Sequence, residues 1–160
     1  MTQLLSNKIE QPRPVAVVCQ GTPFLNILKT ADGIHRRYSE VIEPFGITFQ
    51  QYNVLKIVRS AGTSGIPMTD IADGMIESSP GLTRLIDCLE TKTLVKRVRS
   101  SEDRRVVTCH VTEAGATLLK KMEDTVRKAE QSLMKTMTSE HLATLKTLLT
   151  EVRESFGGEL

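Results

Sequence analysis

A change of hydrophobic period in the middle of the chain limits the folds that it can adopt. Residues 95–99 and 107–111 alternate apolar and polar side chains, whereas the segments on either side repeat apolar residues every three or four positions. Alternation is typical of strands, and the longer spacing is typical of amphipathic helices. The sequence therefore predicts a mostly α-helical protein with a small antiparallel β hairpin of two strands joined by a polar turn.

Helix start signals divide the rest of the chain into six expected helices. Thr48 and Gln51 have the spacing of a capping box, and Ser79–Pro80 and Thr22–Pro23 each pair an N-cap residue with a proline at the first helical position. In the third helix we expect Ile71, Ala72 and Met75 to face inward. The expected helices cover about residues 22–45, 48–61, 69–75, 79–92, 113–133 and 139–156.

Composition excludes several classes of protein. With 39% hydrophobic and 25% charged residues, the chain is typical of a folded domain. Its longest apolar run, residues 15–19, is far shorter than the ~20 residues of a membrane helix, and residues 1–8 lack the pattern of a signal peptide. Three scattered cysteines fit neither a disulfide framework nor a CxxC metal site. We expect a cytoplasmic protein with an irregular arm at 1–21 and a single folded unit at 22–160.

The order of elements between residues 69 and 111 suggests a function. Two helices in close succession are followed by a hairpin, which is the order of a helix-turn-helix with a β wing. Residues 92–105 carry six basic side chains against two acidic ones, so positive charge is concentrated at the hairpin. Such a concentration is typical of a surface that meets phosphate, although most charged runs are simply solvated. Together these features predict binding to double-stranded DNA.

The outer face of the helix at 79–92 supplies the candidate base-reading residues. Serine and threonine hydroxyls donate or accept at base edges, and arginine forms two hydrogen bonds with guanine. A glycine lets the backbone approach a phosphate near the positive end of a helix, although it is also a weak point in a helix. The residues expected on this face are Ser78, Ser79, Gly81, Thr83, Arg84 and Asp87.

The tip of the hairpin carries the second group of candidates. In the sequence Glu102-Asp103-Arg104-Arg105, acids stand next to arginines. One interpretation is a set of exposed ion pairs, which contribute little to stability. The other is that Asp103 holds an arginine extended so that its guanidinium enters the minor groove, and the preceding helix-turn-helix pattern favours this interpretation.

These residues also resemble a known family, the MarR family of bacterial winged-helix regulators. The resemblance runs from Gly46 to Gly115 without gaps, and its most specific part is Asp103-Arg104-Arg105 followed by the helix start at Thr112 to Gly115. The other matching positions are Gly46-Ile47-Thr48, Gln51, Val54, Leu55, Ile71-Ala72, Met75, Leu82-Thr83-Arg84-Leu85, Asp87, Leu89-Glu90, Leu94-Val95, Arg97 and Val111. Outside this stretch the helices fit the family by pattern alone.

The resemblance implies a homodimer that binds a pseudo-palindromic operator. The winged helix-turn-helix lies at about 47–112, and the dimerisation helices at about 22–45 and 113–156. Ser78, Ser79, Thr83 and Arg84 then read the major groove, Arg105 held by Asp103 enters the minor groove, and Arg104 touches the backbone. Two departures from the family are Thr93, where glycine is usual after the recognition helix, and Ile76–Glu77 in the turn before it. A β-branched residue at the expected left-handed position of Thr93 puts the exit from that helix in doubt.

Many relatives bind small aromatic or phenolic acids, and the resemblance implies such an effector here. The candidate ligand-binding residues are His35, Arg37, Tyr38, Phe49 and Tyr52. Each of them also fits an ordinary core or surface position. The expected function is that of a DNA-binding transcriptional regulator, acting as a ligand-responsive repressor.

Other classes of function have less support. A winged-helix module that binds proteins would expose apolar residues on the helix at 79–92, and this helix carries serine, threonine and arginine instead. No motif for an enzyme, a cofactor or a metal site is found, and His35, His110 and His141 lie far apart. Some relatives sense oxidants, but Cys19, Cys88 and Cys109 are expected to be inert.

Overall fold

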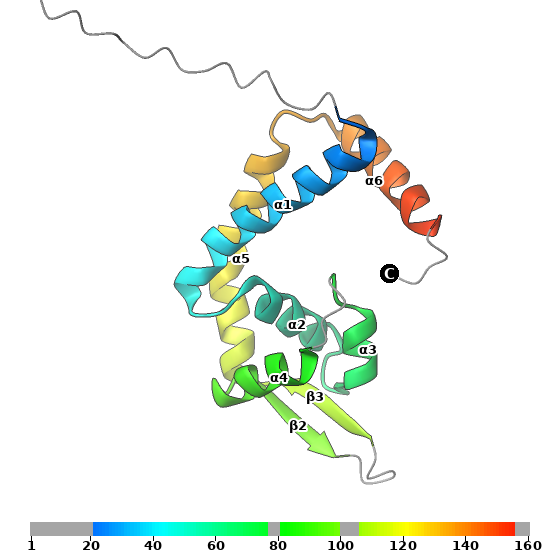
Figure 1. Cartoon of the computed structure of the whole chain (residues 1–160). Coiled ribbons are helices and arrows are strands. Elements are labelled where there is room, and N and C mark those ends of the chain that lie inside the picture. Colours follow the sequence, from blue (N-terminus) through cyan, green and yellow to red (C-terminus); the bar gives the residue numbers. More distant parts are fainter. Residues whose placement is uncertain (1–20, 77–80, 100–105, 156–160) are drawn as a thin grey trace, which may run out of the picture. The chain divides into compact units, whose positions relative to one another are not determined.

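The computed structural model describes residues 21–76, 81–99 and 106–155. Within these ranges the protein is mostly helical, with one small sheet (Figure 1). The chain forms two compact units, which meet between Gly33 and Ile34 inside the first helix. The elements are α1 (Pro23–Ile42), the 3-10 helix η1 (Glu43–Phe45), α2 (Phe49–Ser60), β1 (Ile66–Pro67), α3 (Met68–Asp73), α4 (Leu82–Thr91), β2 (Val95–Arg99), β3 (Val107–Val111), α5 (Glu113–Met134) and α6 (Ser139–Glu154).

Side-chain caps begin three of the helices. The Thr48 side chain accepts from the Gln51 amide, and the Gln51 side chain accepts from the Thr48 amide, both at 3.2 Å, so the predicted capping box of α2 is confirmed. The side chain of Thr112 caps α5 and that of Thr138 caps α6. Each cap satisfies an amide that the helix itself leaves without a partner.

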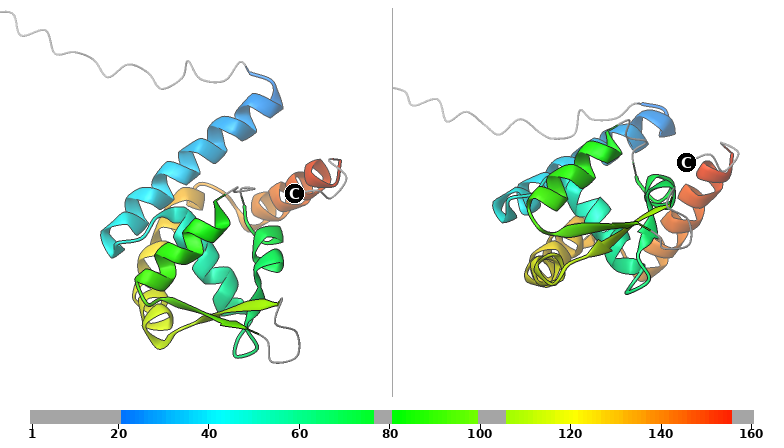
Figure 2. Two further views of the ribbon diagram at one scale, coloured as in Figure 1. Left: turned by 60° about the horizontal axis from the view of Figure 1, so that its bottom comes forward. Right: turned by 90° about the horizontal axis from the view of Figure 1, so that it is seen from below.

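The sheet has three antiparallel strands in the order β1-β3-β2, one more than the sequence predicted. The hairpin of β2 and β3 is confirmed and pairs Arg97 with Cys109. The missed strand β1 has two residues, and Ile66 pairs with Cys109 on the other side of β3. Pro67 lacks an amide hydrogen and is tolerated because β1 is an edge strand. The turned views show β2 and β3 side by side along one side of α2 and α4 (Figure 2).

One hydrophobic core joins the helix-turn-helix, the sheet and α5. Ile71 of α3, Ile86 and Leu89 of α4, Leu55 of α2 and Met122 of α5 have no exposed surface. The apolar positions predicted in α2, α4 and α5 therefore meet in one cluster. Burial of such side chains contributes on the order of 2 kcal/mol each, which fixes α4 firmly against α2 and β2.

The helices α3 and α4 differ in detail from the prediction. α3 ends at Asp73, so Met75 is buried beyond the helix rather than on it. Ala72 is exposed, and its predicted inward position is wrong. α4 begins at Leu82 with Gly81 as its N-cap, two residues later than the predicted start at Pro80. Gly81 is therefore a capping residue and not a weak point inside the helix.

The exit from α4 has the geometry that the family pattern requires, in spite of Thr93. The Leu94 amide donates to the Leu89 carbonyl at 2.9 Å, and the Thr93 amide donates to the Glu90 carbonyl at 2.8 Å. These two bonds form a Schellman motif, in which the residue at Thr93 is left-handed. Thr93 has φ +58°, and no other non-glycine residue among those that the structure describes has a positive φ. The chain therefore keeps the helix exit and accepts a strained threonine.

Thr93→Gly is expected to raise the free energy of unfolding by about 1 kcal/mol, because glycine adopts the left-handed conformation without a Cβ clash. The measurement is the urea unfolding midpoint. The control is Thr91→Gly, two positions earlier in helical conformation, which should lower the free energy of unfolding by about as much. A lower midpoint for Thr93→Gly would contradict the strain assigned to this position.

Candidate nucleic-acid interface

α4 presents a polar outer face beside the hairpin. Thr83 and Arg84 are exposed on its first turn, as the sequence predicted, and Asp87 and Thr91 are the other exposed residues of the helix. The backbone of Gly81 stands just before them and accepts from the Leu85 amide at 3.0 Å. The predicted residues Ser78 and Ser79 lie outside the described residues. Within the described part, the first turn of α4 therefore exposes one hydroxyl and one guanidinium.

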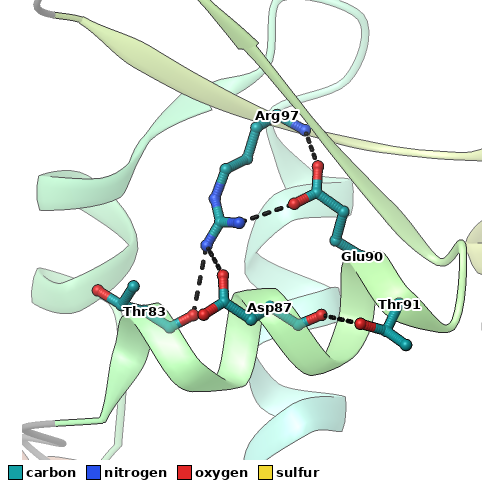
Figure 3. A network of polar contacts seen from close by, with 5 residues as sticks. All are labelled: Thr83, Asp87, Glu90, Thr91 and Arg97. Carbon is teal, nitrogen blue, oxygen red and sulfur yellow. Dashed lines mark hydrogen bonds and ion pairs between the residues drawn. The ribbon is translucent and has the colours of Figure 1, made fainter.

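Arg97 of β2 binds the same helix through a network of polar contacts that the sequence did not reveal (Figure 3). Its Nη2 lies 2.6 Å from Oδ1 of Asp87 and donates to the Thr83 carbonyl at 3.3 Å. Its Nη1 lies 2.7 Å from Oε2 of Glu90, whose Oε1 accepts from the Arg97 amide at 3.1 Å. Asp87 lies on the exposed face of α4, where the sequence placed it, and its carboxylate is paired with Arg97 of the wing strand.

The charge of Arg97 is held firmly by this network. Burial lowers the pKa of the guanidinium, but the hydrogen bonds and charges of Asp87 and Glu90 outweigh burial and raise the pKa above its ordinary value. The Arg97 side chain is 23% exposed, whereas Asp87 is 57% exposed. The network is therefore shielded on the wing side and open on the helix side.

The hairpin extends the positive surface beyond α4. Lys96 and Arg99 of β2 are exposed, and Val98 between them is also exposed. The predicted residues of the tip, Asp103, Arg104 and Arg105, lie outside the described residues. The described part of the hairpin therefore carries exposed positive charge on the strand that precedes the predicted tip.

The short connection between α4 and β2 is hydrogen-bonded to two neighbouring elements. Lys92 Nζ donates to the Gly46 carbonyl and lies 3.5 Å from Oε1 of Gln51, at the start of α2. The Thr112 amide donates to the Leu94 carbonyl at 3.1 Å, at the start of α5. The junction between α4 and β2 is thereby held to the starts of α2 and α5.

The five candidate ligand residues do not form one site in this structure. The Phe49 ring lies 5.0 Å from that of His35 and 5.2 Å from that of Tyr38, so these three form an aromatic cluster. Arg37 makes an exposed ion pair with Glu40 at 3.0 Å.

Tyr52, the fifth candidate, is linked to that cluster through Glu130, which accepts from Tyr38 and lines the same cavity as Tyr52. It is 8% exposed and contacts a cavity of about 220 Å³ between α2 and α5. A larger cavity of about 650 Å³, between Phe45, Lys92 and Leu118, is lined by none of the five candidates.

The Tyr38 phenol donates to Oε1 of Glu130 on α5 at 2.6 Å. Burial, and then this hydrogen bond, raise the pKa of Tyr38 well above its ordinary value. The unfolded chain therefore ionises first as pH rises past about 10, so the stability from this group is complete below that pH and is lost as pH rises toward the folded pKa.

Tyr38→Phe should make the alkaline fall of the unfolding midpoint shallower between about pH 9 and 11. The measurement is urea unfolding at several pH values. Tyr52 and Cys109, whose pKa values are also raised by burial, contribute to the decline that remains. An unchanged pH profile would mean that the Tyr38 to Glu130 bond does not persist in solution.

Cysteine and metal chemistry find little support among the described residues. Cys109 is fully buried on β3, and burial raises the pKa of its thiol, which disfavours the reactive thiolate. Cys88 is half-buried, and Cys19 lies outside the described residues. In the ranges that the structure covers, no three His, Cys, Asp or Glu side chains are grouped as a metal site. Across the same ranges, every helix is too short or too polar to span a bilayer.

Comparison with known proteins agrees with this geometry. A family model described as "Transcriptional regulator SarA/Rot" matches residues 36–122. The multiple antibiotic resistance protein MarR of Escherichia coli is 30% identical over 118 residues, which cover 73% of this chain and 81% of MarR. The HTH-type regulator YhbI of Bacillus subtilis is 28% identical over 129 residues, covering 78% of this chain and 82% of YhbI.

Solved structures resemble the chain in fold. A mutant of E. coli MarR in complex with operator DNA has a TM-score of 0.74 and 28% identity, covering 81% of this chain and 91% of MarR. The S. aureus MepR–DNA complex has a TM-score of 0.77 at 23% identity, covering 85% of this chain and 99% of MepR.

The family model spans more than half of the chain, and its members are transcriptional regulators rather than enzymes. The helix-turn-helix of α3 and α4, the wing of β2 and β3 and the similarity to MarR agree with that match. The chain is therefore a winged helix-turn-helix transcriptional regulator of the MarR and SarA/Rot family.

Proposed function

We propose that this regulator binds double-stranded DNA by inserting α4 into a major groove and the hairpin into the adjacent minor groove. The observation that carries the proposal is the outward placement of Thr83 and Arg84 on a helix whose apolar side is locked into the core. A surface that bound another protein would expose apolar side chains there, but the exposed residues of the described part of α4 are polar or charged. The similar E. coli MarR mutant forms a complex with operator DNA, which supports the same activity here.

The proposed division of labour follows from side-chain chemistry. Arg84 forms a bidentate contact with a guanine, and the Thr83 hydroxyl contacts a base edge or phosphate. Ser78 and Ser79 extend this surface, and Gly81 lets the backbone approach a phosphate. At the wing, Asp103 orients Arg105 toward the minor groove and Arg104 contacts the backbone.

We also propose that the active form is a homodimer built from α1, α5 and α6. α6 has no buried residue, although it carries the apolar side chains Leu142, Leu148, Leu149 and Val152, each between 37% and 52% exposed. The first turns of α1 expose Phe24, Leu25 and Leu28 as well. Apolar surface of this extent is usually covered by a partner, and a symmetric dimer covers it with the same surface of a second copy.

The dimer gives a physical basis for ligand-responsive repression. Two recognition helices must lie about 34 Å apart to use both halves of a pseudo-palindrome. A ligand that prefers another spacing must weaken DNA binding. We propose a small aromatic or phenolic acid as effector, with the His35, Tyr38 and Phe49 cluster, Arg37 and Tyr52 as its candidate contacts. A repressor of this kind acts in the cytoplasm, where bacterial DNA lies.

Selection on random DNA duplexes tests the proposal. We expect recovery of a pseudo-palindrome, and a solution mass about twice the 17.8 kDa of one chain. Binding should weaken steeply as salt rises, because phosphate contacts release counterions. Failure to enrich any sequence, together with no retention on heparin, would refute DNA binding, whereas enrichment of a single half-site by a monomer would refute only the dimer.

A further inference from the structure

Arg97 concentrates four polar contacts on one side of α4. Its two terminal nitrogens bind the carboxylates of Asp87 and Glu90 and the carbonyl of Thr83, and its amide binds Glu90 again (Figure 3). Its register partner on β3 is Cys109, which is fully buried. The arginine therefore projects from a rigid part of the wing, and it ties that strand to the first, second and third turns of the recognition helix.

The position of Asp87 gives this network a consequence for DNA binding. Asp87 follows Thr83 by four residues and Arg84 by three, and residues at these spacings share one face of a helix. An exposed carboxylate therefore lies within one turn of the two proposed base-reading side chains. DNA phosphates repel a carboxylate at such a place unless a cation neutralises it.

Arg97 is the cation that faces Asp87 in this structure. The two groups are 2.6 Å apart, and the arginine also neutralises Glu90 one turn further along. Fork-shaped guanidinium contacts of this kind fix orientation as well as charge. Loss of the Arg97 side chain leaves two uncompensated acids on the recognition helix and frees the wing from it.

We propose that Arg97 is a positioning residue of the DNA-binding surface, which neutralises Asp87 and holds α4 against the wing without touching DNA. This inference rests on the proposed DNA binding and assigns a role to a residue that lies behind the base-reading face. It also explains how an acidic side chain is tolerated beside Thr83 and Arg84.

A double-mutant cycle between Arg97 and Asp87 tests the proposal, with the duplex recovered by selection as the probe. Arg97→Gln should weaken binding about tenfold, because Asp87 and Glu90 then face the phosphates unpaired. Asp87→Asn in that background should restore affinity to within about threefold of the unmutated protein, whereas Asp87→Asn alone should change affinity little. Arg97→Lys keeps the charge and should lose at most about threefold.

Two controls separate this role from general effects of charge and folding. Arg127→Gln removes the same charge from an exposed ion pair with Asp124 on α5 and should leave affinity within about twofold. Thermal unfolding followed by circular dichroism checks that each variant is folded. If Arg97→Gln does not fold, Arg97→Lys is measured alone, and a loss of more than about threefold would contradict neutralisation of Asp87 as the role of Arg97.

Two results would overturn the proposal. One is an Asp87→Asn effect of equal size with and without Arg97, which means that the two residues act independently on DNA binding. The other is a salt dependence reduced by about one unit in Arg97→Gln and not restored by Asp87→Asn, which means that Arg97 contacts a phosphate directly. Absence of any binding by the unmutated protein would instead refute the proposed function itself.

Discussion

Gly115→Ala is expected to lower the free energy of unfolding by about 3 kcal/mol or more, since overpacking against backbone is costly. A Cβ at this position would clash with the Leu94 carbonyl oxygen and would lie 3.0 Å from Cγ2 of Val111. The Leu94 carbonyl cannot move away easily, because it accepts from the Thr112 amide and belongs to the exit of α4. Urea unfolding measures the effect.

The same substitution elsewhere in a helix provides the control. Gly33 lies inside α1, and a Cβ there meets no atom of the chain within 4 Å. Gly33→Ala should therefore raise the free energy of unfolding by about 0.5 to 1 kcal/mol through helix propensity alone. If Gly115→Ala were as stable as the unmutated protein, the close approach of α5 to Leu94 would be wrong.

The Arg84→Ala variant is expected to bind the selected duplex roughly 10 to 100 times more weakly, because a bidentate arginine contact is worth about 1 to 3 kcal/mol of discrimination. The loss should be confined to duplexes that carry the matching base pair, so the variant should tolerate every base at one position of each half-site. Gel-shift titrations against the selected duplex and its single-base variants measure both effects.

Lys120→Ala provides the control for charge, since it removes one positive charge from an exposed position on α5. It should weaken all duplexes equally and only slightly. A uniform loss for Arg84→Ala, of the same size on every duplex, would assign Arg84 to the DNA backbone instead of to a base.

Much of the fold follows from signals only a few residues long. The Thr48 and Gln51 capping box, the helix start at Thr112 and the change of period at Val95 each concern neighbouring residues, and each is confirmed. Such signals are local because a helix end or a strand alternation is satisfied within one or two turns of chain. The family pattern similarly predicted that Thr93 would be left-handed, which its φ of +58° confirms.

The errors occur where distant segments decide the outcome. β1 has only two residues, too few to show a hydrophobic period. It is a strand because it pairs with the edge of β3 that β2 leaves open. Ala72 fits an inward position by spacing but is exposed, since α3 ends at Asp73. In both cases contacts with another part of the fold outweigh local preference.

The amino-acid order alone determined that this chain forms a winged helix-turn-helix, and it determined which face of α4 is polar, because periodicity and capping are properties of adjacent residues. Only the tertiary structure decided that the exposed Asp87 is paired with Arg97. Alternation places Arg97 on one face of a strand, but the acids that it meets come from a helix that precedes it in the chain. Their pairing depends on the angle at which α4 packs on the core, which no short stretch of sequence specifies.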